Sequence, residues 1–165
     1  MDLEEGVPNS DEDLFGPPPE PEPSRRFLWV RAGSEWFGLP VESAREVAPG
    51  KPIAFLPSAP RPVAGLIQIH GTLLPVIDLR LLRGPGQEQP LAAAAMIVLE
   101  KETARIALQV DEVSEVGEIA VNSLKEPGPA SDPWRASCVK QVCEWNGRPR
   151  AILSVEALFD QPKGP

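Results

Sequence analysis

The chain is poor in the side chains that most often carry out chemistry. It contains one histidine, two cysteines and no tyrosine among 165 residues. This supply is too small for the ligand set of a typical structural zinc site. The motifs G-x-S-x-G, H-E-x-x-H and G-x-G-x-x-G and the P-loop are also missing. We therefore expect a protein that is not an enzyme and that holds no metal and no cofactor.

Long apolar runs are missing as well. No run has the length of a membrane span, and the acidic N-terminus lacks the basic and apolar segments of a signal peptide. Two cysteines without a targeting signal fit a reducing compartment. We expect a cytoplasmic protein with no direct membrane insertion.

Basic residues are absent from residues 1–24, which carry eight acidic ones. The whole chain has 24 acidic and 16 basic residues, so the remaining 141 residues carry 24 − 8 = 16 acidic against 16 basic residues. A neutral body behind an acidic arm has no electrostatic reason to bind nucleic acid. We expect nucleic acid not to be a partner.

Residues 1–24 are predicted to be a disordered, acidic, proline-rich tail. The segment GPPPEPEP at 16–23 is unsuited to both helix and sheet. Leu14-Phe15 follows the acidic run 11–13 and has two interpretations: it belongs to a solvated spacer, or it is a short docking motif in a polar arm.

Residues 26–160 have the alternating apolar pattern and the turn signals of an all-β domain. The 21 prolines of the chain favour short elements over long helices. Asn146-Gly147 is the strongest hairpin signal, and Gly33-Ser34 is another turn pair. The strand pairs predicted from these patterns are 27–32 with 35–40, 65–70 with 72–78, 92–101 with 104–113, and 137–145 with 148–155. Residues 126–133 are predicted to be a loop, and EALFD at 156–160 a short helix.

The hairpin at 65–78 contains the only histidine. Alternation places Leu66, Gln68 and His70 on one face of its first strand and the two isoleucines on the other. Pro75 removes a donor from the second strand, which we therefore expect to be an edge at that point. His70 is either a contact residue or a half-exposed strand histidine without a role.

The segments 71–82 and 147–158 echo each other at an offset of 76 residues. Each reads as a turn glycine, a strand, a polar helix cap and one helical turn, with Asp78 and Ser154 at the cap positions. The echo predicts two small β units, at about 27–83 and 91–160, on either side of the linker 84–90. Units of this size bury little surface alone, so we expect them to share a core, and an exchange of strands between them stays open.

The remaining reactive side chains have structural interpretations. Cys138 and Cys143, five residues apart on a predicted strand, would face opposite sides and are expected to be buried small hydrophobes. Asp111, Glu112 and Glu115 are expected to serve strand ends and turns, not catalysis.

Four segments, taken in order, resemble the CheW domain of bacterial chemosensory systems. They are FGLPVESAREV, I-x-x-LP at 53–57, VAGLIQIHGTLLPVIDLRLL, and MIVLE followed by ARIALQVDEVSEV. The resemblance covers about residues 26–160. It implies two packed five-stranded SH3-like β-barrels with short helices. It also implies an adaptor that couples chemoreceptors to a CheA-type histidine kinase, with recruitment to receptor clusters.

The implied partners are the regulatory domain of the kinase and the cytoplasmic tip of a chemoreceptor, which the family takes in a crevice between the barrels. By the resemblance, partner-binding residues lie on the 44–47 strand and in the central signature. They are Ala44, Arg45, Glu46, Val47, Gln68 and His70. The structural positions of the family motifs are Gly65, Gly71, Pro75, Asp78 and Asp111, with Asp78 as a helix cap.

His70 departs from the family pattern. The family usually reads Asn-Leu-Arg-Gly where this chain reads Gln68-Ile69-His70-Gly71. Histidine is shorter than arginine and is mostly neutral at pH 7. The departure therefore suggests an altered choice of partner. Besides the coupling adaptor, two alternatives stay open: a divergent CheW-like module that binds only a receptor or a localisation partner without the kinase, and a small hydrolase or metal protein.

Overall fold

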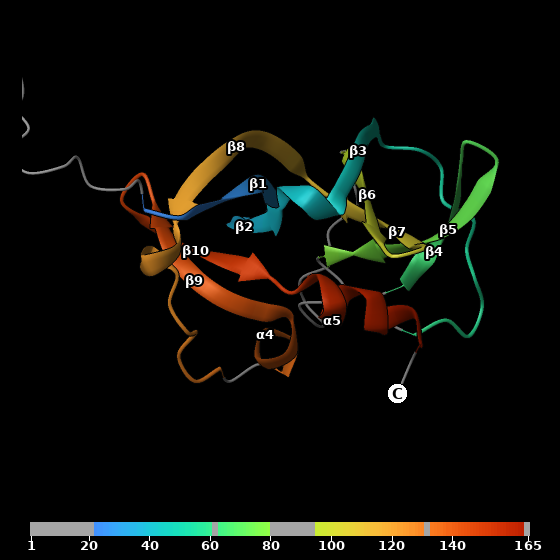
Figure 1. The fold of residues 1–165 in the computed structure, drawn as a ribbon. Coiled ribbons are helices and arrows are strands. Elements are labelled where there is room, and N and C mark those ends of the chain that lie inside the picture. Colours follow the sequence, from blue (N-terminus) through green and yellow to red (C-terminus); the bar gives the residue numbers. More distant parts are fainter. Residues whose placement is uncertain (1–21, 61–62, 80–94, 131–132, 164–165) are drawn as a thin grey trace, which may run out of the picture.

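The computed structural model describes residues 22–60, 63–79, 95–130 and 133–163. These residues form two five-stranded sheets that lie side by side, with a short helix, α5, between them (Figure 1). The first sheet has the order β8-β1-β2-β10-β9, and the second has the order β3-β6-β7-β5-β4. The all-β class predicted from the sequence is confirmed.

The first sheet consists of β1 (Ser24–Ala32), β2 (Glu35–Pro40), β8 (Glu112–Ala120), β9 (Val139–Trp145) and β10 (Arg148–Leu153). The second consists of β3 (Ala44–Pro49), β4 (Val63–Ile69), β5 (Thr72–Asp78), β6 (Ala95–Lys101) and β7 (Ala104–Val110). The short helices are η1 (Val41–Ser43), η2 (Val121–Ser123), α4 (Pro133–Cys138), α5 (Val155–Asp160) and η3 (Gln161–Lys163).

Each sheet combines strands from both halves of the chain. The hairpin β1–β2 joins β8, β9 and β10, while the hairpin β6–β7 joins β3, β4 and β5. The two sheets therefore have one topology, in which the first two strands of one repeat pair with the last three of the other. In both sheets the fifth strand of a repeat runs parallel to the second strand of the other, as β10 does to β2 and β5 to β7. Neither sheet corresponds to 27–83 or to 91–160 alone.

Both sheets curve until their edges meet, and one isolated bridge joins the edges of each. In the second sheet, Ala54, which follows edge strand β3, exchanges two 2.8 Å backbone hydrogen bonds with Leu66 on edge strand β4. In the first sheet, Lys125, which follows β8, exchanges two 2.9 Å bonds with Val142 on β9. Closure of this kind removes exposed sheet edges. We refer to the two closed sheets as barrel 1 and barrel 2.

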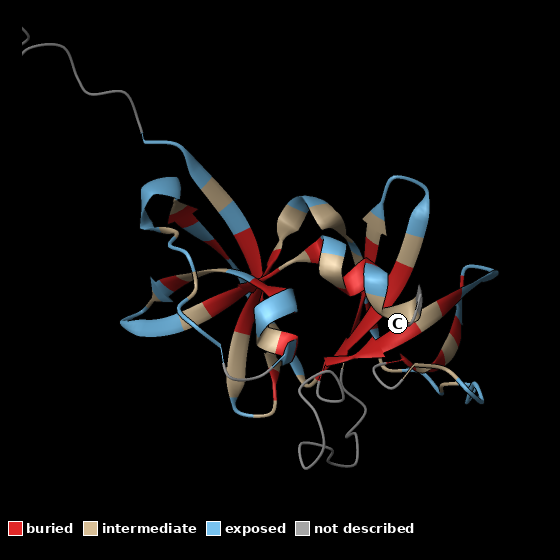
Figure 2. Ribbon diagram, turned by 90° about the horizontal axis from the view of Figure 1, so that it is seen from below, coloured by how far each residue is buried: buried red, intermediate tan, exposed pale blue. Residues whose placement is uncertain are grey.

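The core has three parts. Barrel 1 encloses a small cluster around Phe27 and Trp29, and barrel 2 encloses one around Ile67 and Met96. The largest cluster takes side chains from both barrels, including Phe37 and Leu39 from the first and Ile97 and Leu108 from the second. Figure 2 shows buried segments in the middle of both barrels. Since this shared cluster is buried only while the barrels are in contact, the hydrophobic effect holds them together.

The predicted hairpin turns are confirmed by their backbone angles. Asn146 and Gly147 have φ of 52° and 77°, as a type I′ turn requires. His70 and Gly71 have φ of 50° and 81° and form the turn between β4 and β5. The prediction that His70 lies on a strand face is therefore wrong in one respect, because β4 ends at Ile69. Within β4, the predicted alternation is confirmed: Ile67 and Ile69 are buried and Gln68 is exposed.

β5 is an edge strand for only part of its length. Pro75 pairs with Leu66 on β4, and the parallel pairing with β7 begins at the next residue, Val76. The N–H that proline lacks is thus missing just before the second neighbour begins, as the sequence led us to expect.

The helix α4 was not predicted. Residues 137–138, assigned from the sequence to a strand, are the end of this helix. Its buried Trp134 packs edge-on against Phe37, with ring centroids 5.9 Å apart, so tertiary packing decides the local conformation. The helix at 156–160 is confirmed as part of α5, where Ser154 is the N-cap and accepts a 3.2 Å hydrogen bond from the Ala157 N–H. The corresponding turn predicted after Asp78 falls mostly on residues 80–82, outside the described residues.

The tail boundary shifts slightly. Ser24, assigned from the sequence to the tail, is the first residue of β1, and the Val121 N–H donates a 2.9 Å hydrogen bond to the Pro23 carbonyl. Residues 1–21 of the predicted tail lie outside the described residues.

We predict that Gly65→Ala strongly destabilises the protein. Gly65 has φ of 154°, and a Cβ there would overlap the carbonyl oxygen of Ala54, which belongs to the bridge that closes barrel 2. The cost should be about 3 kcal/mol or more. Thermal denaturation measures it, with Gly128→Ala as the control, since nothing lies within 4 Å of a Cβ at Gly128. Equal melting temperatures of the two variants would contradict the prediction.

Candidate partner-docking surface

The four predicted partner-binding residues of β3 differ in exposure. Ala44 is partly buried and packs against the shared core, so it faces inward. Arg45 and Val47 are exposed, and Glu46 is intermediate. The pairing of β3 with β6 shifts register between Ala44 and Glu46, a bulge that re-aims the side chains after it. Only three of the four side chains are therefore available at the surface.

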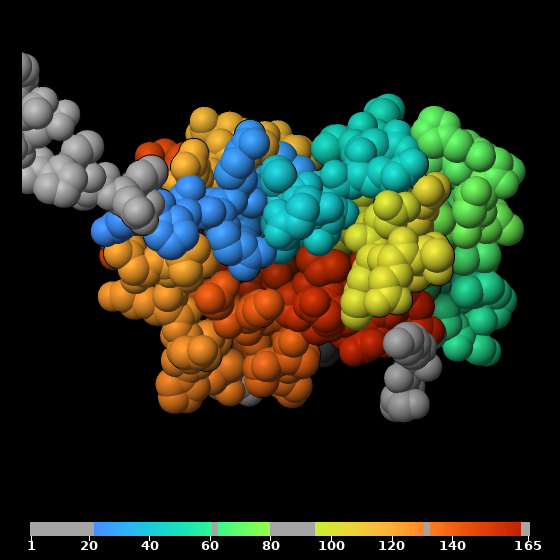
Figure 3. Space-filling view, in the orientation of Figure 1, coloured from blue at the N-terminus to red at the C-terminus, as the bar shows by residue number. Residues whose placement is uncertain are grey.

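The structure brings Glu46 and His70 together. The Nε2 atom of His70 lies 3.0 and 3.2 Å from the two carboxylate oxygens of Glu46. The His70 side chain is 76% exposed and that of Glu46 is 35% exposed. The contact joins β3 to the β4–β5 turn beside the closure of barrel 2. Figure 3 shows these two parts of the chain, teal and green, adjoining at the surface.

Exposed apolar side chains accompany these polar ones. Leu73 on β5 pairs with Gln68 across the hairpin and is 64% exposed, while Val47 is 49% exposed. Phe55, in the segment after β3, is 80% exposed. We call Glu46, Val47, Gln68, His70 and Leu73 the seam surface, because their strands meet where barrel 2 closes.

Sequence reasoning missed Leu73 and Phe55. The signal for Leu73 was present: Leu74 and Val76 are buried, so alternation along β5 directs Leu73 outward. Phe55 lies in a proline-rich segment without period, so its exposure could not be read from a pattern.

Arg45 is held by partners within barrel 2. Its Nη1 lies 3.3 Å from Glu100 Oε1, and Arg105 Nε lies 2.8 Å from Glu100 Oε2. The hydrogen bond from Arg105 lowers the pKa of Glu100, with the charge of Arg45 as a further cause. Glu100 therefore stays ionised between two arginines at neutral pH.

Three residues predicted to be structural, Gly65, Asp78 and Asp111, lie at a close backbone contact, in the core and at a strand crossover. Gly65 allows the close approach of the Ala54 carbonyl, and Asp78 is buried. Asp111 lies at the crossover from β7 in barrel 2 to β8 in barrel 1. Its carboxylate accepts a 2.6 Å hydrogen bond from the Gly33 N–H, and its own N–H donates to the Arg31 carbonyl at 2.8 Å. The structural interpretation of Asp111 agrees with this geometry.

The cysteines lie in different cores. Cys138 is at the end of α4 in the shared cluster, whereas Cys143 lies on β9 inside barrel 1. The expectation that both lie on one strand is wrong, but both are buried, as predicted. Burial raises the pKa of each thiol. Among the residues that the structure describes, no three His, Cys, Asp or Glu side chains are grouped to hold a metal ion.

The described part of the chain also contains no helix that is long and apolar enough to cross a membrane.

Comparison with known proteins decides the family. The model of the CheW-like domain matches residues 26–163, which is most of the chain. The chain belongs to the CheW-like domain family. Two relatives are the chemotaxis protein CheW of Rhizobium meliloti (strain 1021) and the probable chemotaxis protein CheW of Rhizobium etli. The first is 23% identical over 135 residues, covering 82% of this chain and 87% of the relative. The second is 25% identical over 137 residues, covering 83% and 88%.

A solved structure agrees with this assignment. The scaffolding protein TtCheW of Thermoanaerobacter tengcongensis is 25% identical to this chain and superposes with a TM-score of 0.75. The match covers 84% of this chain and 94% of that one. The resemblance and the two-barrel fold predicted from the sequence are confirmed.

We predict that both thiols react slowly in the native protein. Because burial raises their pKa, the thiolate fraction at neutral pH is small, and the reagent also lacks access. Titration with a chromogenic disulfide should label both cysteines quickly in denaturant and slowly without it. Fast labelling of either cysteine under native conditions would contradict their placement in the cores.

Proposed function

We propose that this protein is a non-catalytic adaptor that couples chemoreceptors to a CheA-type histidine kinase in a bacterial chemosensory pathway. Membership of the CheW-like family carries the proposal, and the seam surface supports it. In this role the protein is cytoplasmic and is recruited to receptor clusters. It makes and breaks no covalent bond and needs no cofactor.

The seam surface has the composition of a contact site. Leu73 and Val47 offer exposed apolar side chains, and Glu46, Gln68 and His70, on the same strands and their turn, offer donors and acceptors. Protein interfaces commonly combine an apolar centre with a polar rim. Burying an exposed leucine side chain contributes about 1.5–3 kcal/mol, so Leu73 alone can decide the affinity. We assign its apolar side chains, Leu73 and Val47, to contact with the regulatory domain of the kinase.

We assign His70, at the β4–β5 turn, to contact with the tip of a chemoreceptor. An arginine at this position would carry a permanent charge and five donors, which His70 does not have. Its contact with Glu46 occupies Nε2 and leaves one ring nitrogen for a partner. The histidine therefore offers a receptor tip fewer polar contacts at this position than an arginine would.

Leu73→Asp should weaken binding to the kinase regulatory domain by about tenfold or more, because a charge would replace apolar contact area. Titration calorimetry measures the affinity. Val121→Asp is the matched control, since Val121 is an exposed apolar side chain of η2, on the barrel 1 side. Equal affinities of Leu73→Asp and the wild type would remove the seam surface from the kinase interface.

His70→Arg should change the affinity for receptor tips and leave kinase binding intact. A pull-down with both partners checks this, and unchanged binding of every receptor would contradict the role of His70. Co-purification also separates the coupling adaptor from the divergent CheW-like module that was considered from the sequence. A protein that retains a receptor but never a kinase domain would be the divergent module that does not engage the kinase.

A further inference from the structure

Barrel 1 has an open cavity that the proposed coupling function does not use. Its volume is about 520 Å³, a size typical of small-molecule sites. It lies between the starts of β2 and β10, whose parallel pairing is limited to Ala151 with Phe37 and Ile152 with Gly38. The residues that precede these pairs leave a gap between the two strands. The cavity in this gap is lined by Ser34, Glu35, Trp36, Arg148, Pro149 and Arg150.

The two arginines of the cavity lie on the interior side of barrel 1. Phe37 and Ala151 belong to the shared core, whereas Ile152 belongs to the cluster inside barrel 1. Arg150 and Arg148 precede Ile152 by two and four residues, so alternation along β10 directs them to the side of that cluster. They lie beyond its end, since burial falls from Ile152 to the exposed Arg148. We call the cavity the mouth of barrel 1, and barrel mouths are common places for ligand sites.

The Arg150 guanidinium is held between two indole rings. It lies 4.9 Å from the ring centre of Trp29 and 5.1 Å from that of Trp36. Trp29 is fully buried and packs so closely over Gly38 that a Cβ there would come within 2.8 Å of the ring. Attraction between a cation and an aromatic ring needs no oxygen acceptor, so the N–H donors of Arg150 stay available to a ligand. Because the rings already fix this side chain, a ligand binds it with little further loss of entropy.

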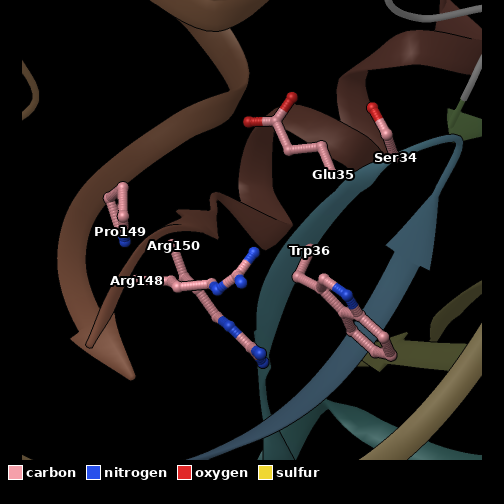
Figure 4. A pocket seen from close by; sticks show the side chains of 6 residues that line it. All are labelled: Ser34, Glu35, Trp36, Arg148, Pro149 and Arg150. Atoms are coloured by element: carbon pink, nitrogen blue, oxygen red, sulfur yellow. The ribbon is translucent and has the colours of Figure 1, made fainter. Parts of the chain in front are cut away.

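Positive charge prevails in the mouth of barrel 1. Among the described residues, neither Arg148 nor Arg150 forms an ion pair or a side-chain hydrogen bond. Glu35, the acidic residue of the lining, is already paired with Arg135. Burial lowers the pKa of Arg150, and the nearby charge of Arg148 lowers it further, against the opposing effect of Glu115. The two guanidinium groups therefore repel each other, and an anion bound to both would offset this repulsion. Figure 4 shows both arginine side chains extending from β10 toward Trp36.

We propose that the mouth of barrel 1 binds a small organic phosphate, whose phosphate group accepts hydrogen bonds from Arg148 and Arg150. A guanidinium group can donate two parallel N–H bonds to phosphate oxygens. A phosphate monoester carries close to two negative charges at neutral pH, which balances the two arginines. The hydroxyl of Ser34, in the same lining, offers a further donor. The remaining volume has room for an organic part of the size of a sugar.

A titration of the full chain with ribose 5-phosphate, followed by nuclear magnetic resonance, tests the proposal. The signals of the Trp36 indole and of the Arg148 and Arg150 side chains should shift to saturation, with a Kd of about 1 mM or tighter, while Leu73 stays unchanged. Inorganic phosphate should bind more weakly, because it lacks the organic part. Succinate, a dicarboxylate of similar charge, should also bind more weakly, because it lacks the tetrahedral phosphate.

Variants of the two arginines separate specific binding from a general charge effect. Arg148→Gln should lower the affinity about two- to fivefold, because Arg148 is exposed, and Arg150→Gln about tenfold or more. Arg150→Lys keeps the charge without the paired donors and should recover only part of the loss. Arg26→Gln is the matched control, since it removes the same charge from an exposed residue at the other end of β1. Replacement of the exposed Arg148 leaves the barrel core untouched, so misfolding cannot imitate its effect.

Four results would overturn the proposal. They are no saturable shift at Trp36 and the two arginines, an affinity for succinate or inorganic phosphate equal to that for ribose 5-phosphate, equal effects of Arg26→Gln and Arg148→Gln, and tighter binding of a phosphoserine peptide, which would assign the mouth to a protein partner. The proposal does not depend on the coupling function, because none of these measurements involves a kinase or a receptor.

Discussion

The shared core is the interaction on which the rest of the structure depends. Each barrel alone encloses a small cluster, whereas the largest cluster draws side chains from both. Small β units bury too little apolar surface to be stable alone. The exchange of hairpins between the repeats makes the shared cluster unavoidable, because every barrel contains strands of both halves. The position of the seam surface follows from this arrangement.

The hairpins could be predicted from the sequence because their signals are local. Turn residues such as Asn146-Gly147 and alternating apolar positions decide each pair without help from distant residues. The exchange of strands could not be predicted, since pairing between β2 and β10 depends on residues more than a hundred positions apart. Local patterns also failed at α4, where packing of Trp134 against Phe37 decides the conformation.

The candidate site could be predicted only in part, because its residues carry local signals but come together through long-range pairing. Glu46 and His70 were selected separately through motifs, and only the closure of barrel 2 places their side chains 3.0 Å apart. His70 was placed on a strand because alternation does not reveal a left-handed backbone. A surface cavity of barrel 1, lined by Trp36, Arg148 and Arg150 among others, has no signature in the sequence, because its two walls meet only through the parallel pair of β2 and β10.

The crossover at Asp111 has a mechanical consequence. One carboxylate ties the strand that leaves barrel 2 to the first turn of barrel 1. A force that pulls the barrels apart would load this short connection and the β1–β2 hairpin together, and neither barrel could swing freely as on a flexible hinge. We therefore expect the two barrels to move as one rigid body, so that a displacement of one barrel also displaces the other.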